Sequence, residues 1–182
     1  MEKIGAGSFR IVYAYPDDPE SLAVKVPRVE VRRHGRAMNS EEIKSHRLFP
    51  EIFPRTHNDN LDQLVVDRAD IIVTPDDLMR AVPELMRLSS MQTQGSIWDL
   101  FRALIGVALN RSSSADVEQE FGIPSRLIKS VVKKSRLLSA LASAVDTLNI
   151  DVTDIDRGNI GVSRSTKKFV LVDASTLAGF AG

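Results

Sequence analysis

The stretch RIVYAYPDDPESLAVKVPR (10–28) has the pattern of two strands joined by a turn. Residues 10–15 and 21–28 are rich in β-branched and aromatic side chains, which favour strands. Between them, YPDDPE (15–20) carries the proline and aspartate residues that are typical of turns. The pattern predicts an antiparallel hairpin near the beginning of the chain.

The region after this hairpin predicts one helix and one further strand region. The segment 28–38 is basic and reads as irregular. NSEEIKSHRLF (39–49) predicts a helix capped by Asn39 or Ser40, because its glutamates then lie in the first turn, where the helix dipole favours them. DQLVVDRADIIV (62–73) predicts strand structure with a polar break at Asp67–Asp70.

The rest of the chain is predicted to be mostly helical. The apolar spacing predicts helices at 74–88 with a division at Pro83, at 96–110, and over 112–150 with a break at Gly122–Pro124. Two short strands follow at 159–162 and 168–173. A β-rich first part followed by helices makes the predicted fold class α+β.

Composition narrows the classes of function. The chain has 182 residues, a formal net charge of zero, three histidines and no cysteine. Disulfides and thiolate metal sites are therefore excluded, and no overall charge favours nucleic-acid or membrane partners. No apolar run reaches the roughly 18–20 residues that would span a bilayer. The first residues lack the pattern of a signal peptide, so a cytoplasmic protein is expected.

A pair of glycines near the beginning of the chain could bind an anion. In IGAGSFRIVY (4–13), Gly5 and Gly7 precede a β-branched strand. Glycines there let the backbone approach a phosphate closely, although the same spacing is common in ordinary turns.

A lysine lies in the second strand of the predicted hairpin. Lys25 sits in the apolar run AVKV, and a buried ammonium needs an anionic partner; an edge-strand lysine would face water instead. Glu42 on the next predicted helix can be that partner, with Glu41 as the alternative.

TDIDRGNI (153–160) gathers polar groups in a predicted loop. Asp154 and Asn159 are five residues apart, and Asp173 follows at the end of a predicted strand. Mg²⁺ prefers a few carboxylate or amide oxygens together with phosphate oxygens, so Asn159 and Asp173 could hold it. Asp154 could orient a hydroxyl group and accept its proton.

In this order along the chain, these pieces resemble the protein-kinase superfamily. In its short length, the chain is most similar to the small protein kinases of T-odd-type podophages, which act in host takeover. The resemblance implies a single minimal kinase-like domain with two lobes, an N-lobe at 1–67 and a truncated, mostly helical C-lobe at 68–182. It also implies ATP- and Mg²⁺-dependent phosphoryl transfer to a Ser or Thr hydroxyl of a protein.

The resemblance assigns roles to single residues. Asp154, Lys25 and Glu42 would be catalytic, and Asn159 and Asp173 would bind the metal. The nucleotide would be bound by Gly5, Ala6, Gly7, Ser8, Val12, Ala23, Lys25, Asp67 and Ala69. Of these, Asp67 and Ala69 mark the segment whose backbone would contact adenine.

Several positions depart from the kinase pattern. Arg10 stands where the third glycine is expected, and Asp156 stands where Ser/Thr kinases have a lysine. The expected activation segment is not found after Asp173, so nucleotide binding follows from the resemblance better than protein phosphorylation does. A pseudokinase that binds a partner protein, or a small-molecule kinase similar to aminoglycoside phosphotransferases, therefore remains an alternative.

A different class of function comes from SADVEQEFGIPSRLIKSVVKKS (114–135). Two predicted helices meet at a Gly-Ile-Pro turn, and the second carries basic residues, as in a helix-turn-helix that binds DNA. Val117, Phe121 and Ile128 have the spacing that would pack the two helices together. The other reading is a solvated basic face on two ordinary helices.

Overall fold

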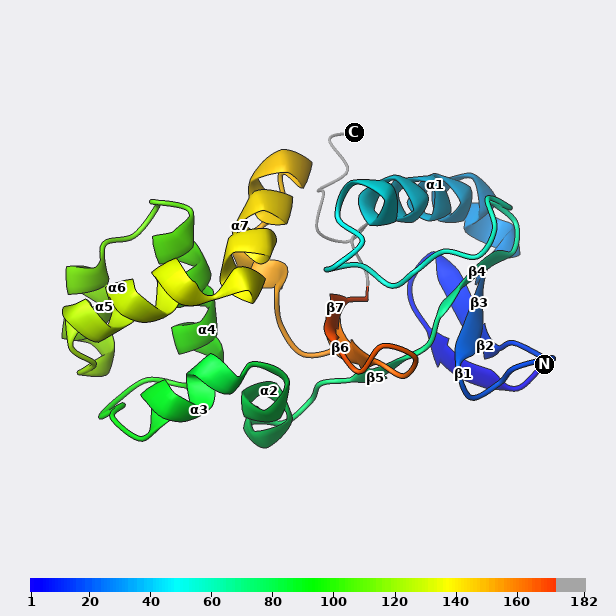
Figure 1. Cartoon of the computed structure of the whole chain (residues 1–182). Coiled ribbons are helices and arrows are strands. Elements are labelled where there is room, and N and C mark those ends of the chain that lie inside the picture. Colours follow the sequence, from blue (N-terminus) through cyan, green and yellow to red (C-terminus); the bar gives the residue numbers. More distant parts are fainter. Residues whose placement is uncertain (173–182) are drawn as a thin grey trace. The chain divides into compact units, whose positions relative to one another are not determined.

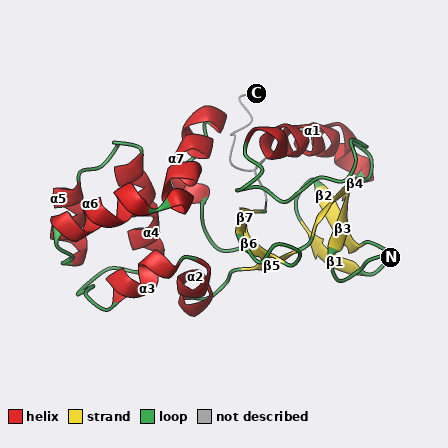
Figure 2. Ribbon diagram, viewed as in Figure 1, coloured by secondary structure: helices red, strands yellow, loops and turns green. Residues whose placement is uncertain are grey.

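The computed structural model describes residues 1–172 and has an α+β architecture (Figure 1). Within these residues there are seven α-helices and two small antiparallel sheets, so the predicted fold class is confirmed at this level. Contacts divide the chain into two units. Figure 2 shows which segments are helices and which are strands. The first unit holds Met1–Ile71 and the described residues from Ile160 onward, and the second holds Ile72–Asn159. The lobe boundary predicted at residue 67 stays a prediction.

The first sheet contains the predicted hairpin. Its strands are ordered β1 (Lys3–Ala6), β2 (Arg10–Ala14), β3 (Leu22–Pro27) and β4 (Leu64–Asp67). In the β2–β3 hairpin, Val12 lies opposite Lys25. The sequence did not predict β1, in which Gly5 pairs with Val12. Gly5 and Ala6 are therefore strand residues, and the glycine loop is reduced to the turn at residues 7–9.

Helix α1 (Arg32–Leu48) begins earlier than predicted. The irregular segment expected at 28–38 is wrong, because a short 3-10 helix (Val29–Val31) leads directly into α1. Asn39 is thus in the helix interior rather than at its cap. Gly35 lies so close to β3 that an added Cβ would be 2.6 Å from Pro27 Cβ. A glycine that looks like a helix breaker in the sequence instead allows α1 to pack against the strand.

The first unit has an apolar core between its sheet and α1. Ala23, Ile43, Leu64 and Val66 are all buried there. Helix α1 packs against β3, the strand that carries Lys25. This packing brings one face of the helix to the face of the sheet on which Lys25 lies.

The second sheet joins segments that are far apart in the sequence. Strand β5 (Ala69–Ile71) pairs with β6 (Ile160–Ser163), which pairs with β7 (Phe169–Leu171). The polar break in the predicted strand at 62–73 is Arg68, where β4 ends and β5 begins. Asp173, the predicted metal ligand after β7, lies outside the described residues.

The second unit is helical, as predicted. Its helices are α2 (Pro75–Ala81), α3 (Pro83–Ser89), α4 (Ile97–Ala108), α5 (Ser114–Phe121), α6 (Ser125–Lys134) and α7 (Arg136–Leu148). Thr74 caps α2 by accepting a hydrogen bond from the backbone N–H of Asp77, and Pro83 begins α3. Helix α4 packs against α5, α6 and α7 through fully buried side chains such as Leu104. No helix in residues 1–172 has both the length and the apolar character needed to cross a membrane.

Candidate functional site

A buried cluster of charges joins β3 to α1. Lys25 Nζ lies 2.5 Å from Glu42 Oε1, and both side chains are almost fully buried. Glu41, the alternative partner, is exposed and lies 3.7 Å from Lys44 Nζ. Of the two glutamates left open by the sequence, Glu42 is therefore the one that pairs with Lys25.

The cluster contains a second cation that the sequence did not predict. Arg10 Nη1 donates to Glu42 Oε2 at 2.7 Å and to Asn39 Oδ1 at 3.0 Å. Asn39 Nδ2 in turn donates to the backbone oxygen of Leu61 at 2.8 Å. Arg10 occupies the position of a kinase glycine, so the resemblance gave no reason to expect it inside. The alternation of side chains along a strand could have indicated that Arg10 is buried. Arg10 lies on the same sheet face as Val12, which packs against the apolar core.

Lys25 also contacts the end of the described chain. Its Nζ donates to the backbone oxygen of Val172 at 2.9 Å, across 147 positions of sequence. Val172 directly precedes Asp173, the predicted metal ligand. The first unit thus brings the strand lysine, its glutamate and the residue before that aspartate together.

The predicted phosphate loop is a tight turn on the surface. Gly7 N–H donates to the Arg10 oxygen at 2.9 Å, and Arg28 Nε donates to the Gly7 oxygen at the same distance. Ala6, Gly7 and Ser8 are exposed. An added Cβ at Gly7 would meet nothing within 4 Å, so one side of the turn has room for a ligand.

The predicted nucleotide-binding residues outside the glycine turn have other contacts. Ala23 is 4% exposed and belongs to the apolar core, against which Val12 also packs. Arg68 N–H donates to the Ser21 oxygen, and the Arg68 oxygen accepts from Arg164 N–H. Several backbone groups of the segment from Asp67 to Ala69 are thus already bonded within the protein.

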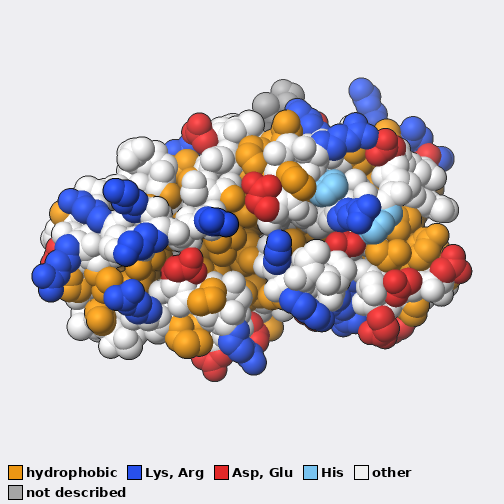
Figure 3. Space-filling view, in the orientation of Figure 1, with side chains coloured by type: hydrophobic (Ala, Val, Ile, Leu, Met, Phe, Trp, Pro, Cys, Tyr) orange, Lys and Arg blue, Asp and Glu red, His pale blue; other side chains and the backbone are white. Residues whose placement is uncertain are grey.

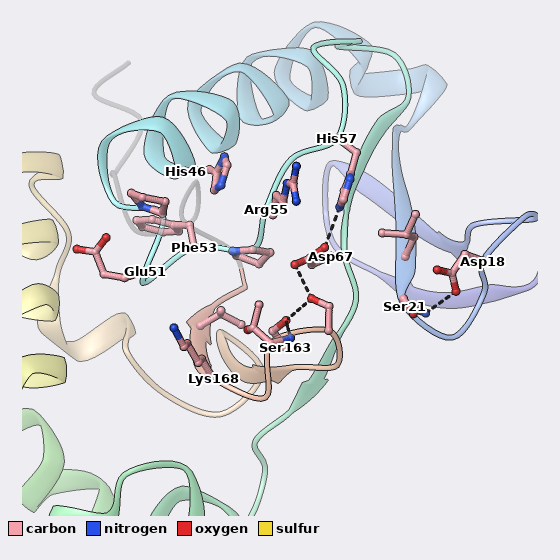
Figure 4. A pocket seen from close by; sticks show the side chains of 16 residues that line it. Asp18, Ser21, His46, Glu51, Phe53, Arg55, His57, Asp67, Ser163 and Lys168 are labelled. Carbon is pink, nitrogen blue, oxygen red and sulfur yellow. Dashed lines mark hydrogen bonds and ion pairs between the residues drawn. The ribbon is translucent and has the colours of Figure 1, made fainter.

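The Asp67 side chain lies in a hollow of about 610 Å³ in the first unit (Figure 4). Its carboxylate is 6% exposed and lies 2.8 Å from His57 Nε2, and it accepts a hydrogen bond from Ser165 Oγ at 2.7 Å. These bonds fasten β4 to the loop at residue 57 and to the turn between β6 and β7. The role of Asp67 that the structure makes visible is therefore to join these segments.

The polar loop of the second unit is held by its own side chains. Asn159 Nδ2 donates to the Asp154 backbone oxygen at 2.9 Å, which closes the loop between the two predicted site residues. Asp151 Oδ1 accepts from Thr153 N–H at 2.9 Å and caps the 3-10 helix Val152–Asp154. Asp154 lines a hollow of about 670 Å³ together with Arg102, which is not one of the predicted site residues.

Two further loop residues have defined partners. Asp156 Oδ2 lies 3.6 Å from Arg102 Nη1, so the carboxylate in the position of the missing lysine faces a cation. The Arg157 guanidinium lies 5.9 Å from the centre of the Trp98 ring and makes a cation–π contact with it. Trp98 is buried, and its Nε1 has no hydrogen-bond partner among the described residues.

The two carboxylates at the start of this loop have pKa values that shift in opposite directions. Burial, and then the charge of Asp151, raise the pKa of Asp154. The hydrogen bonds from Thr153 lower the pKa of Asp151. A partly buried carboxyl with a raised pKa fits the role of a group that accepts a proton.

These shifts predict opposite effects of pH on stability. Burial disfavours the ionised form of Asp154 in the folded state. The folded protein therefore has its full stability below the unfolded pKa of Asp154, and it loses stability as the pH rises through the raised folded pKa. Asp154→Asn should therefore gain stability over wild type as the pH rises from about 3 to 7, measured by urea denaturation. Asp151→Asn is the matched control and should lose stability over the same interval, because its carboxylate has a lowered pKa. Parallel pH profiles of the two variants would contradict this assignment.

The expected metal ligands are only partly described. Residues 1–172 contain no cluster of three or more His, Asp or Glu side chains that could hold a metal ion. The predicted set uses the amide oxygen of Asn159 and the carboxylate of Asp173 instead. The hydrogen bond of Asn159 to the Asp154 backbone uses its Nδ2 and not the amide oxygen of the predicted set.

No protein-family model matches the chain, and no curated protein matches its sequence. The resemblance to kinases therefore stays a prediction that depends on the residues of the sequence alone.

Proposed function

We propose that the chain is an ATP- and Mg²⁺-dependent phosphotransferase with a two-lobed, kinase-like arrangement, and that it acts in the cytoplasm on a Ser or Thr hydroxyl of a protein. The observation that carries the proposal is the buried Lys25–Glu42 pair, with Lys25 also bonded to the residue before Asp173. An edge-strand lysine that faces water would have neither a buried glutamate partner nor this contact with Val172. A lysine held by a glutamate is the arrangement that protein kinases use, and a fixed ammonium can neutralise phosphate charge, which supports the proposal.

The first unit would supply the nucleotide-binding groups. Lys25 would contact the α- and β-phosphates while Glu42 holds its side chain in position. The exposed turn at Gly7 and Ser8 would cover the phosphates with backbone N–H groups. Any adenine contact near Ala69 would use backbone groups that the two sheets leave unbonded.

The loop of the second unit would supply the acceptor chemistry. Asp154 would orient the acceptor hydroxyl and take its proton, which its partial burial and raised pKa favour. Asn159 and Asp173 would hold Mg²⁺, which neutralises charge on the phosphate oxygens when it is bound.

Nucleotide binding is tested by thermal melting with and without Mg²⁺-ATP. At about 100 times the Kd, a ligand that binds only the folded state adds about 2.7 kcal/mol, or a shift of about 5–10 °C for a chain of this size. We expect this shift in wild type and its loss in Lys25→Met. Lys44→Met, at an exposed lysine of α1, is the matched control and should keep the shift. A wild-type melting curve that millimolar Mg²⁺-ATP leaves unchanged would refute the proposal.

Catalysis is tested separately with Asp154→Asn. This variant should keep the thermal shift, because Asp154 is not assigned to nucleotide binding, and should lose transfer of labelled phosphate to a mixed protein substrate by at least about 100-fold. A wild-type protein that binds nucleotide and transfers no phosphate would support the pseudokinase alternative instead.

A further inference from the structure

Helices α5 and α6 pack together through a set of buried apolar residues. Each of these side chains is at most 7% exposed: Val117, Phe121, Ile123, Ile128 and Val131. Both helices also pack against α4, so three consecutive helices form one cluster within the second unit. This matches the packing of a helix-turn-helix, in which a supporting helix holds the second helix of the pair.

The turn between the two helices has a defined geometry. Gly122 ends α5 in the left-handed conformation, with φ at +74°, and its N–H donates to the Glu118 oxygen at 2.8 Å. An added Cβ at Gly122 would be 2.2 Å from Thr93 Oγ1, so the position requires glycine for both space and conformation. Pro124 then precedes the first residue of α6. The direction in which α6 leaves the turn is thus fixed by these residues.

The outer face of α6 is basic. Arg126, Lys129 and Lys133 are exposed and are spaced by three and four residues, which places them on one side of the helix. The buried Ile128 and Val131 lie on the opposite side. On the face of the molecule in Figure 3, several Lys and Arg side chains gather in the region of α6.

The local charge differs sharply from the average of the chain. Residues 121–145 contain five basic side chains and no acidic one, whereas the acidic side chains of the helix pair, Asp116, Glu118 and Glu120, all lie on α5. The basic side chains of α6 form no ion pair with any described residue. At the N-terminus of α6, Glu118 Oε2 accepts a hydrogen bond from Ser125 N–H at 3.1 Å. The overall charge thus hides a region that can attract phosphates.

We infer that α6 is a docking surface for double-stranded DNA, contacted through its phosphates. A helix of this kind fits the major groove, which is about 12 Å wide. From Arg126 to Lys133 the helix rises about 10 Å, so three cations lie within reach of neighbouring phosphates. The supporting cluster of α4 and α5 presents the basic face outward. This surface is distinct from the residues proposed for phosphoryl transfer.

The test measures fluorescence anisotropy of a labelled random duplex of about 20 base pairs, at about 50 and 200 mM salt. Wild type should bind, and its affinity should fall about 40-fold between the two salt concentrations if three phosphates are contacted. Lys129→Glu/Lys133→Glu should bind at least about tenfold more weakly and lose about two units of the salt slope. Lys167→Glu/Lys168→Glu, an equal change of charge in the first unit, is the matched control and should bind like wild type.

The milder pair Lys129→Gln/Lys133→Gln guards against misfolding and should also reduce the salt slope. Both α6 variants should keep the melting shift with Mg²⁺-ATP, so a failed nucleotide site and a failed DNA surface give different results. No binding of the duplex by wild type at low salt would overturn the inference. Equal weakening by the α6 pair and the control pair would also overturn it, because the attraction would then be general charge rather than this helix.

Discussion

Glu42→Gln should lower the free energy of unfolding by about 3–5 kcal/mol in urea denaturation. Glu42 is 1% exposed, and its two carboxylate oxygens each accept a bond from a different buried cation, Lys25 and Arg10. A neutral amide cannot balance those two charges, and its NH₂ group would point a donor at one of them. Loss of one partner in a buried charge cluster costs far more than loss of a surface ion pair.

The adjacent residue provides the control for this prediction. Glu41→Gln changes the same chemical group one position earlier on α1, where the side chain is half exposed and lies 3.7 Å from the exposed Lys44 Nζ. Its effect should be at most about 0.5 kcal/mol. If Glu42→Gln were equally mild, the buried cluster would not stabilise the first unit as its geometry indicates.

Gly35→Ala should destabilise the first unit by about 2 kcal/mol, although alanine is the better helix former by about 1 kcal/mol. The added Cβ would be 2.6 Å from Pro27 Cβ and 2.8 Å from the Phe9 backbone oxygen. Neither neighbour can rotate away, since one belongs to a proline ring and the other to the main chain. Helix α1 would have to move off β3, which would disturb the Lys25–Glu42 contact as well.

Gly106→Ala is the control for this prediction because it also lies inside a helix, α4. There the added Cβ would be 3.0 Å from Ser112 Oγ, a side-chain atom that can rotate away. Gly106→Ala should leave the free energy of unfolding within about 0.5 kcal/mol of wild type or raise it. Equal losses at the two glycines would show that the close approach of α1 to β3 is not what requires Gly35.

The sequence alone determined the elements whose signals are local. The hairpin of β2 and β3, the division of helices at Pro83 and the helix pair around Gly122 all follow from the residues of their own segments. Turn prolines, capping side chains and apolar spacing act over a few positions, so they can be interpreted without a fold. The pairing of Lys25 with a glutamate was also predictable, because a buried ammonium needs an anion.

Only the tertiary structure decided the features that depend on contacts between distant segments. The sequence did not predict β1. It also did not predict the start of α1 at Arg32, because glycine disfavours helices and only the folded structure shows that Gly35 is needed where α1 packs closely against β3. It could not choose Glu42 over Glu41, since that choice depends on which side of α1 faces the sheet. It likewise gave no reason to bury Arg10, whose charge is compensated by a residue 32 positions away. Burial of a charge depends on partners that folding brings together, and the spacing of residues along the chain does not contain that information.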